Sequence, residues 1–120
     1  MLHYDLSPLL RFQLDDAAIA KLPWKDFGNG TAIAKLAREG ETGLVAYRIA
    51  KDAGDDAFRR HTHPGGETYL VLRGAITDES GTYPEGSILW LDPGSRHTPR
   101  GSRERDTVIL VLWPNGIKAE

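Results

Sequence analysis

The sequence contains no cysteine. This absence excludes disulfides, thiolate nucleophiles, iron–sulfur clusters and cysteine-based zinc sites. Long apolar runs are also missing, so no membrane-spanning helix is expected, and the first residues lack the basic and apolar regions of a secretory signal. We therefore expect a cytoplasmic protein, with no membrane contact, in which any bound metal is held by imidazole and carboxylate groups.

Neither sign of charge dominates the chain, which has 15 Lys and Arg residues against 17 Asp and Glu residues. This balance gives no electrostatic reason to expect nucleic acid or an anionic membrane as a partner. The length of 120 residues, with 40% hydrophobic and 27% charged residues, is typical of one globular domain with one core. We predict a single domain over residues 1–120.

From residue 31 onward the chain consists of short β-prone runs separated by turn signals, a spacing typical of a β-sandwich or β-barrel. The predicted strand runs are 31–38, 44–51, 68–77, 82–83, 87–91 and 107–113. Several runs are apolar at odd and even positions alike, as in 108–112. One face can line a barrel interior while the other packs on a second sheet or on another subunit. The fold class is therefore predicted to be all-β.

The first thirty residues give a weaker signal. Residues 15–22, DDAAIAKL, suit either a short helix or a loop packed over the barrel. We expect residues 1–23 to form an N-terminal extension that packs on a core covering 24–114. His3 lies in this unpatterned region and is interpreted as having no metal-binding role.

Three of the four histidines and one carboxylate form a pattern suited to one divalent ion. His61 and His63 are two apart, so on a strand both imidazoles point to the same side. A short turn through 64–66 can bring Glu67 back toward them, and His97 follows a Pro-Gly turn thirty residues later. We predict a site of three nitrogens and one oxygen formed by His61, His63, Glu67 and His97. The alternative is that these four polar residues are unrelated and form the pattern by coincidence.

These residues resemble the two motifs of the cupins, small double-stranded β-helix or jelly-roll barrels. The first cupin motif, G-x5-H-x-H-x3,4-E-x6-G, is matched after its first glycine by the run from His61 to Gly74. The second, G-x5-P-x-G-x2-H-x3-N, is matched more loosely around 93–97, and Gly101 stands where the family has asparagine. The resemblance implies a jelly-roll barrel holding one divalent metal ion.

The resemblance is closer to the ChrR-like subgroup, named for the cupin half of a zinc-dependent anti-sigma factor. Its pattern H-x-H-x-G-G-E, then D-E-x-G-x-Y-x-x-G-S, then P-x-G-S-x-H-x-P is followed by 61–67, 78–87 and 93–99. The likeness covers residues 24–113. The anti-sigma factor's other half carries a His/Cys zinc motif that grips the sigma factor, and this motif is missing from the cysteine-free chain. The chain is therefore expected to differ from a complete anti-sigma factor.

Residues beside the predicted ligands are candidates for substrate binding. Arg59 and Arg96, with Arg60 and Arg100, could attract an anionic group, although solvated loop charges are the alternative. Tyr69 shares parity with Glu67, so it should face the barrel interior near the metal, either as a hydrogen-bond donor to a ligand or as a core aromatic. No residue outside the four ligands compels a general acid or base.

Three functions remain open at this point. The first is a metalloenzyme acting on a small oxygenated compound, such as a metal-dependent dioxygenase, which the family resemblance implies. The second is a metal-dependent small-molecule sensor or binding module, and the third is a metal-stabilised barrel without chemistry. The metal could be Zn, Fe, Mn, Ni or Cu, because all accept this ligand set. Expected partners are a small-molecule ligand or substrate and a second copy of the chain in a homodimer.

Overall fold

The computed structural model describes residues 15–54, 61–113 and 118–119. The run 15–22, which the sequence left open, forms a short helix, α1 (Asp16–Ala20). The Asp15 side chain caps it by accepting a hydrogen bond of 2.8 Å from the backbone amide of Ala18. Residues 1–14 lie outside the described part, so the rest of the expected N-terminal extension stays a prediction. None of the described helical residues forms a segment long and apolar enough to cross a membrane.

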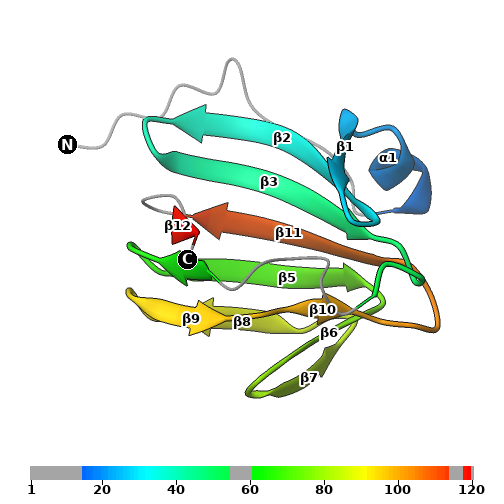
Figure 1. The fold of residues 1–120 in the computed structure, drawn as a ribbon. Helices are drawn as coiled ribbons and strands as arrows, with labels where there is room; N and C mark the ends of the chain where they lie inside the picture. Colours follow the sequence, from blue (N-terminus) through cyan, green and yellow to red (C-terminus); the bar gives the residue numbers. More distant parts are fainter. Residues whose placement is uncertain (1–14, 55–60, 114–117, 120) are drawn as a thin grey trace.

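The described strands form one large sheet and two small ones (Figure 1). The large sheet has the order β1-β2-β3-β11-β5-β8, and its members are β1 (Trp24–Gly28), β2 (Thr31–Glu39), β3 (Thr42–Ile49), β11 (Thr107–Trp113), β5 (Glu67–Arg73) and β8 (Ile88–Leu91). The small sheets are β10-β6-β7, made of β10 (Arg100–Gly101), β6 (Ala75–Asp78) and β7 (Gly81–Pro84), and β12-β4-β9, made of β12 (Lys118–Ala119), β4 (His61–His63) and β9 (Ser95–His97). This arrangement confirms the predicted jelly-roll fold.

The predicted strand runs are present, with ends that differ by up to two residues, and one run is divided. The run 68–77 is divided into β5 and β6 at Gly74, whose φ of 78° lies in the left-handed region. A Cβ at this position would lie 2.5 Å from Thr107 Oγ1 and 2.9 Å from Thr107 Cα. The Thr107 hydroxyl in turn donates to the carbonyl of Ala75 at 3.1 Å. The chain can therefore change sheets at this point only with a glycine.

The inner face of the large sheet carries the main core. Alternate residues of β3, β5 and β11 point inward, and the buried members of this cluster include Tyr47, Tyr69, Val71, Ile109 and Val111. Burial in this core therefore explains the apolar residues at the inward-facing positions of these strands.

The outer face of the same sheet is covered at one end. There, Ile19 of α1 packs with Leu72 and Val108. At the other end, on β8, Ile88 and Trp90 are 70% and 68% exposed. The outer face of β11 is therefore covered by α1, as expected, whereas that of β8 is exposed within the described single chain, so that the expected cover by another subunit is not tested.

The crowding at Gly74 predicts a large effect of one methyl group. We expect Gly74→Ala to lower the free energy of unfolding by about 3 kcal/mol, because left-handed backbone costs a Cβ-bearing residue about 1–2 kcal/mol and overpacking adds a similar amount. Gly40→Ala is the matched control, since Gly40 also has positive φ but a Cβ there would meet nothing within 4 Å. Urea denaturation measures both, and equal losses would contradict the crowding argument.

Candidate metal centre

The predicted ligands come from three strands that two turns bring together. In β4, His61 pairs with His97 of β9, and His63 pairs with Ser95. The carbonyl of His63 accepts hydrogen bonds from the amides of Gly66 at 3.0 Å and Gly94 at 2.7 Å. These two bonds join the 64–66 turn to the 93–94 turn. The chain therefore begins β5 at Glu67 directly beside the histidine strands.

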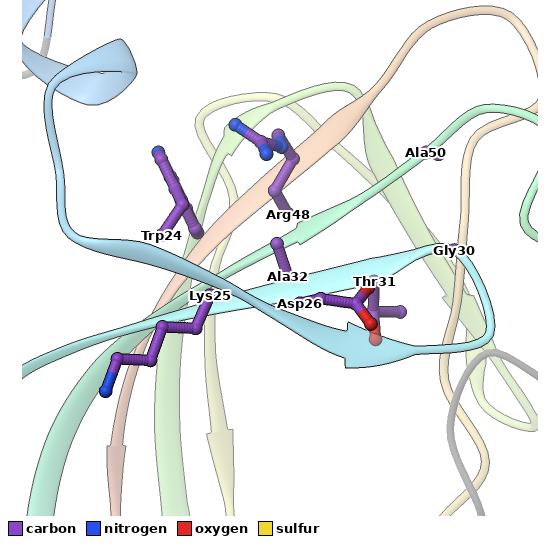
Figure 2. A pocket seen from close by; sticks show the side chains of 8 residues that line it. All are labelled: Trp24, Lys25, Asp26, Gly30, Thr31, Ala32, Arg48 and Ala50. Atoms are coloured by element: carbon purple, nitrogen blue, oxygen red, sulfur yellow. The ribbon is translucent and has the colours of Figure 1, made fainter.

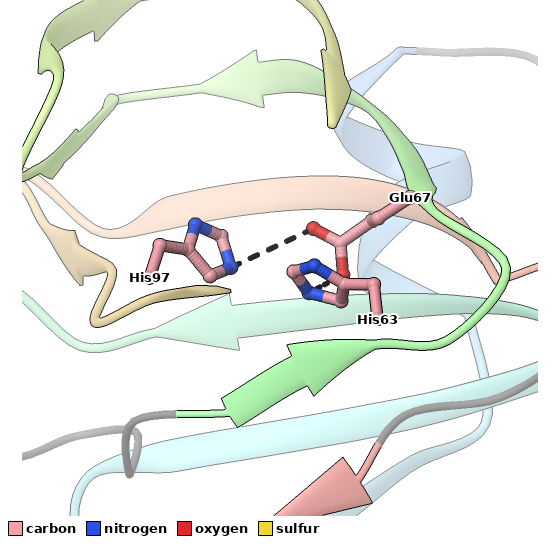
Figure 3. Close-up of side chains that lie close together, drawn as sticks. All are labelled: His63, Glu67 and His97. Atoms are coloured by element: carbon pink, nitrogen blue, oxygen red, sulfur yellow. Dashed lines mark ion pairs between the residues drawn. The ribbon is translucent and has the colours of Figure 1, made fainter. Parts of the chain in front are cut away.

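Three of the predicted ligands meet in the interior (Figure 3). Nε2 of His63 lies 2.9 Å from Oε2 of Glu67, and Nε2 of His97 lies 3.9 Å from Oε1 of the same carboxylate. The two imidazole rings are in edge contact, with centroids 4.8 Å apart. His63, Glu67 and His97 are 0%, 5% and 4% exposed. The structure thus places a carboxylate between two buried imidazoles.

This donor set fits a divalent ion. One ligand atom from each of the three residues lies within 4.8 Å of the others. Donors bound to one zinc ion at about 2.0–2.2 Å can be separated by at most about 4.4 Å, so a small side-chain rotation brings the observed set to that spacing. A buried carboxylate is costly unless it is paired, and an ion would supply that pairing. The same ligand chemistry suits Zn, Fe, Mn and Ni.

The fourth predicted ligand is placed only through its backbone. His61 lies in β4 opposite His97, but its side chain is outside the described part of the structure. The three-histidine, one-glutamate set therefore stays a prediction, with three of its members brought together.

Two polar residues hold the far nitrogens of the imidazoles. Nδ1 of His97 lies 3.2 Å from Oδ2 of Asp78, and Nδ1 of His63 lies 3.2 Å from the Ser95 hydroxyl. Such contacts fix the ring orientation and leave Nε2 for an ion. Burial alone would raise the pKa of Asp78, but hydrogen bonds from the Ser80 hydroxyl and amide and from His97 outweigh it, and the pKa falls below its usual value.

The sequence analysis gave neither of these residues a role at the site. Ser95 precedes His97 by two residues, so their side chains point to the same face of the strand. This alternation could have indicated that Ser95 lies near the site. Asp78 gives no such signal, because it reaches His97 from another sheet.

The candidate substrate-binding residues are placed differently. Tyr69 is buried, its ring centroid lies 6.5 Å from that of His97, and its hydroxyl has no hydrogen-bond partner among the described residues. Burial, followed by the charges of Asp78 and Glu67, raises the pKa of Tyr69 well above its usual value. Arg96 is exposed on β9, and Arg59 lies outside the described residues. A substrate-binding role for these three residues stays a prediction.

One contact to the cluster involves a residue to which the sequence analysis gave no role at the site. The indole Nε1 of Trp113 donates a hydrogen bond of 2.7 Å to Oε2 of Glu67. Trp113 lies on the same strand face as the inward-facing Ile109 and Val111. This alternation could have indicated that its side chain points toward the interior.

A separate hollow of about 290 Å³ lies on the outer side of β1, β2 and β3 (Figure 2). Here the guanidinium of Arg48 stacks over the Trp24 ring at 4.8 Å from its centroid. Arg48 alternates with the inward-facing Tyr47 and Ile49, so this hollow is separated from the histidines by the sheet.

Comparison with known proteins identifies the relatives of this chain. The sequence model of the ChrR cupin-like domain family matches residues 15–114. The chain is 34% identical over 88 residues to the anti-sigma-E factor ChrR of Cereibacter sphaeroides, covering 73% of this chain and 40% of that protein. It is also similar to the crystal structure of Rhodobacter sphaeroides SigE in complex with the anti-sigma ChrR, with 32% identity, a TM-score of 0.68, and coverage of 78% of this chain and 50% of that chain.

More distant structures share the fold. Hydroxypropylphosphonic acid epoxidase from S. wedmorenis matches with 15% identity and a TM-score of 0.62, covering 78% of this chain and 55% of the enzyme. The chain thus spans 40% of the length of its curated relative and half of the chain in the solved complex.

These relatives correct the expected partners. The sequence analysis expected a small molecule and a second copy of the chain, whereas a similar domain belongs to an anti-sigma factor solved with its sigma factor. The expectation was wrong because it was drawn from the resemblance to metalloenzyme cupins and from the apolar strand faces, and because the missing His/Cys zinc motif led the sequence analysis away from a sigma-factor partner. Near-neutral charge argues against nucleic acid, but a surface that binds another protein is about as apolar as the rest of a protein surface.

The centre predicts a metal-dependent gain in stability. Zn²⁺ at about 100 times its dissociation constant should raise the free energy of unfolding by about 2.7 kcal/mol, and a chelator should remove this gain. Glu67→Gln should weaken zinc binding roughly tenfold or more, since even residues behind metal ligands have effects of that size. Glu79→Gln is the matched control, because Glu79 is exposed and accepts from the Thr98 amide. Isothermal titration and denaturation measure both effects, and equal zinc affinity in the two variants would exclude Glu67 as a ligand.

Proposed function

Because this chain belongs to the ChrR cupin-like domain family, we propose that it is a metal-dependent sensor or binding module whose metal state is read by a protein partner. The observation that carries this proposal is the buried group of His63, Glu67 and His97 in a domain of that family. In the proposal these three residues hold one divalent ion, and His61 is the fourth ligand.

The ion would supply a Lewis-acidic position at which a small molecule can bind. The chain's own contribution at this position is the Tyr69 hydroxyl, which is buried beside His97 and has no hydrogen-bond partner among the described residues. A buried hydroxyl without a partner costs about 1–3 kcal/mol, and that cost is removed when a bound molecule accepts a hydrogen bond from it. We propose that Tyr69 recognises an oxygen-containing group at the centre.

The proposed partner is a protein of the sigma-factor class. This proposal draws on the anti-sigma identity of the relative and on the solved SigE complex. Since the chain spans only part of those relatives, binding of a sigma factor by this chain is a proposal and not a property taken over from them. A partner of this class also implies the cytoplasmic location expected from the sequence.

A dioxygenase has less support than a sensor. The enzymes among the structural matches, including the epoxidase, are about 15% identical to this chain and share its fold alone. Around the described cluster, Ser95, Asp78 and Trp113 contact the ligands and are placed to orient them. The dioxygenase interpretation therefore rests on the family resemblance only.

The proposal is tested by partner binding in two metal states. The chain is immobilised, loaded with Zn²⁺ or treated with a chelator, and exposed to purified sigma factors of the source organism in biolayer interferometry. We expect one sigma factor to bind at least tenfold more tightly in one metal state than in the other. Glu67→Gln should behave like the chelated protein and Glu79→Gln like the wild type. The same affinity in both states, or no binding of any sigma factor, would contradict the proposed readout.

A further inference from the structure

Trp113 connects the end of β11 to the centre of the cluster. Its indole Nε1 donates to Glu67 Oε2 at 2.7 Å, across 46 positions of sequence. The ring is half-buried and packs beside Tyr47, with centroids 5.9 Å apart. Gly43 faces it across the strands, and a Cβ added there would lie 3.5 Å from the indole. The ring is thus held with its single donor directed at the carboxylate.

The bond divides the two carboxylate oxygens of Glu67 between different neighbours. Oε2 accepts from Trp113 and lies 2.9 Å from His63 Nε2, whereas Oε1 is directed toward His97 at 3.9 Å. An indole N–H is a donor only, so it cannot bind a metal ion itself. Its effect on the centre must therefore act through the orientation and charge of Glu67.

The other two tryptophans do not have this arrangement. Nε1 of Trp24 donates to the carbonyl of Ile19 at 2.9 Å, and Nε1 of Trp90 donates to Asp92 at 3.1 Å on the exposed surface. Trp113 alone among the three indoles contacts the described ligand cluster.

From this geometry we infer that Trp113 is a positioning residue of the metal centre. Its N–H fixes Oε2, so that the carboxylate keeps its place between the two imidazoles before an ion arrives. With an ion held by His63, Glu67 and His97, the carboxylate would carry less charge to attract the indole N–H, and the hydrogen bond from Trp113 would weaken. The Trp113 N–H is therefore a direct reporter of metal occupancy. This inference rests on the metal binding in the proposed function and adds a residue to it.

The test compares two tryptophan variants of the full chain. Trp113→Phe keeps an aromatic ring and removes the N–H, and Trp90→Phe makes the same change at the exposed site. We expect Trp113→Phe to weaken zinc binding by about tenfold to a hundredfold, the range found for residues that orient metal ligands. Trp90→Phe should bind zinc as the wild type does. Isothermal titration with Zn²⁺ measures each affinity.

A spectroscopic measurement separates positioning from packing. In ¹H–¹⁵N spectra of the wild type, each of the three indole N–H groups gives one signal, assigned by its loss in Trp24→Phe, Trp90→Phe and Trp113→Phe. Zinc should shift the Trp113 signal most and leave that of Trp90 in place. Because this measurement uses the unmutated chain, a shift of the Trp113 signal cannot come from packing that is lost in a variant. If Trp113→Phe fails to fold, the assignment from the other two variants leaves this measurement intact.

The outcomes distinguish the inference from the proposed function. If the wild type binds zinc but Trp113→Phe binds it equally well, or the Trp113 signal does not shift, the positioning role is wrong and the metal centre stands. If the wild type binds none of Zn²⁺, Mn²⁺, Ni²⁺ or Fe²⁺, both are overturned.

Discussion

The arrangement of the strands around the candidate metal centre depends on one buried carboxylate, that of Glu67. Glu67 lies at the first position of β5, almost without exposure, between imidazoles from two other strands. A carboxylate in such a place is tolerated only where charge or hydrogen bonds compensate its lost hydration. Here the indole of Trp113 supplies one hydrogen bond, and the imidazoles of His63 and His97 are polar neighbours of the carboxylate. β4, β5, β9 and β11 are therefore all connected to this single group.

The backbone near the site has an equally specific role. The carbonyl of His63 accepts from Gly66 and Gly94, so the turn before β5 and the turn before β9 share one acceptor. A Cβ at Gly66 would lie 2.7 Å from the carbonyl of Leu91. The Gly-rich and Pro-Gly segments of the sequence thus bring two ligand-bearing strands close together.

The sequence predicted those features that are local or periodic. The all-β architecture, most strand runs and the proximity of His63, Glu67 and His97 follow from alternation, turn residues and the resemblance to the cupins. The contacts of Asp78 and Trp113 with the ligands could not be predicted in the same way, because they join residues 19 and 46 positions apart through the tertiary fold. The break of the 68–77 run at Gly74 likewise depends on Thr107, a neighbour from another strand. A sigma-factor partner was not expected from the sequence, because the chain lacks the cysteine-containing zinc motif of the anti-sigma factor's other half.

The short strand β12 has a mechanical consequence. Lys118 pairs with Thr62 and Ala119 with His61, so β12 lies beside the strand that carries two of the predicted ligands. A load applied to β12 would act on β4 and its histidines through these two backbone pairs. A load applied to α1 would be borne by the packing of Ile19 on Leu72 and Val108, on the outer face of the large sheet.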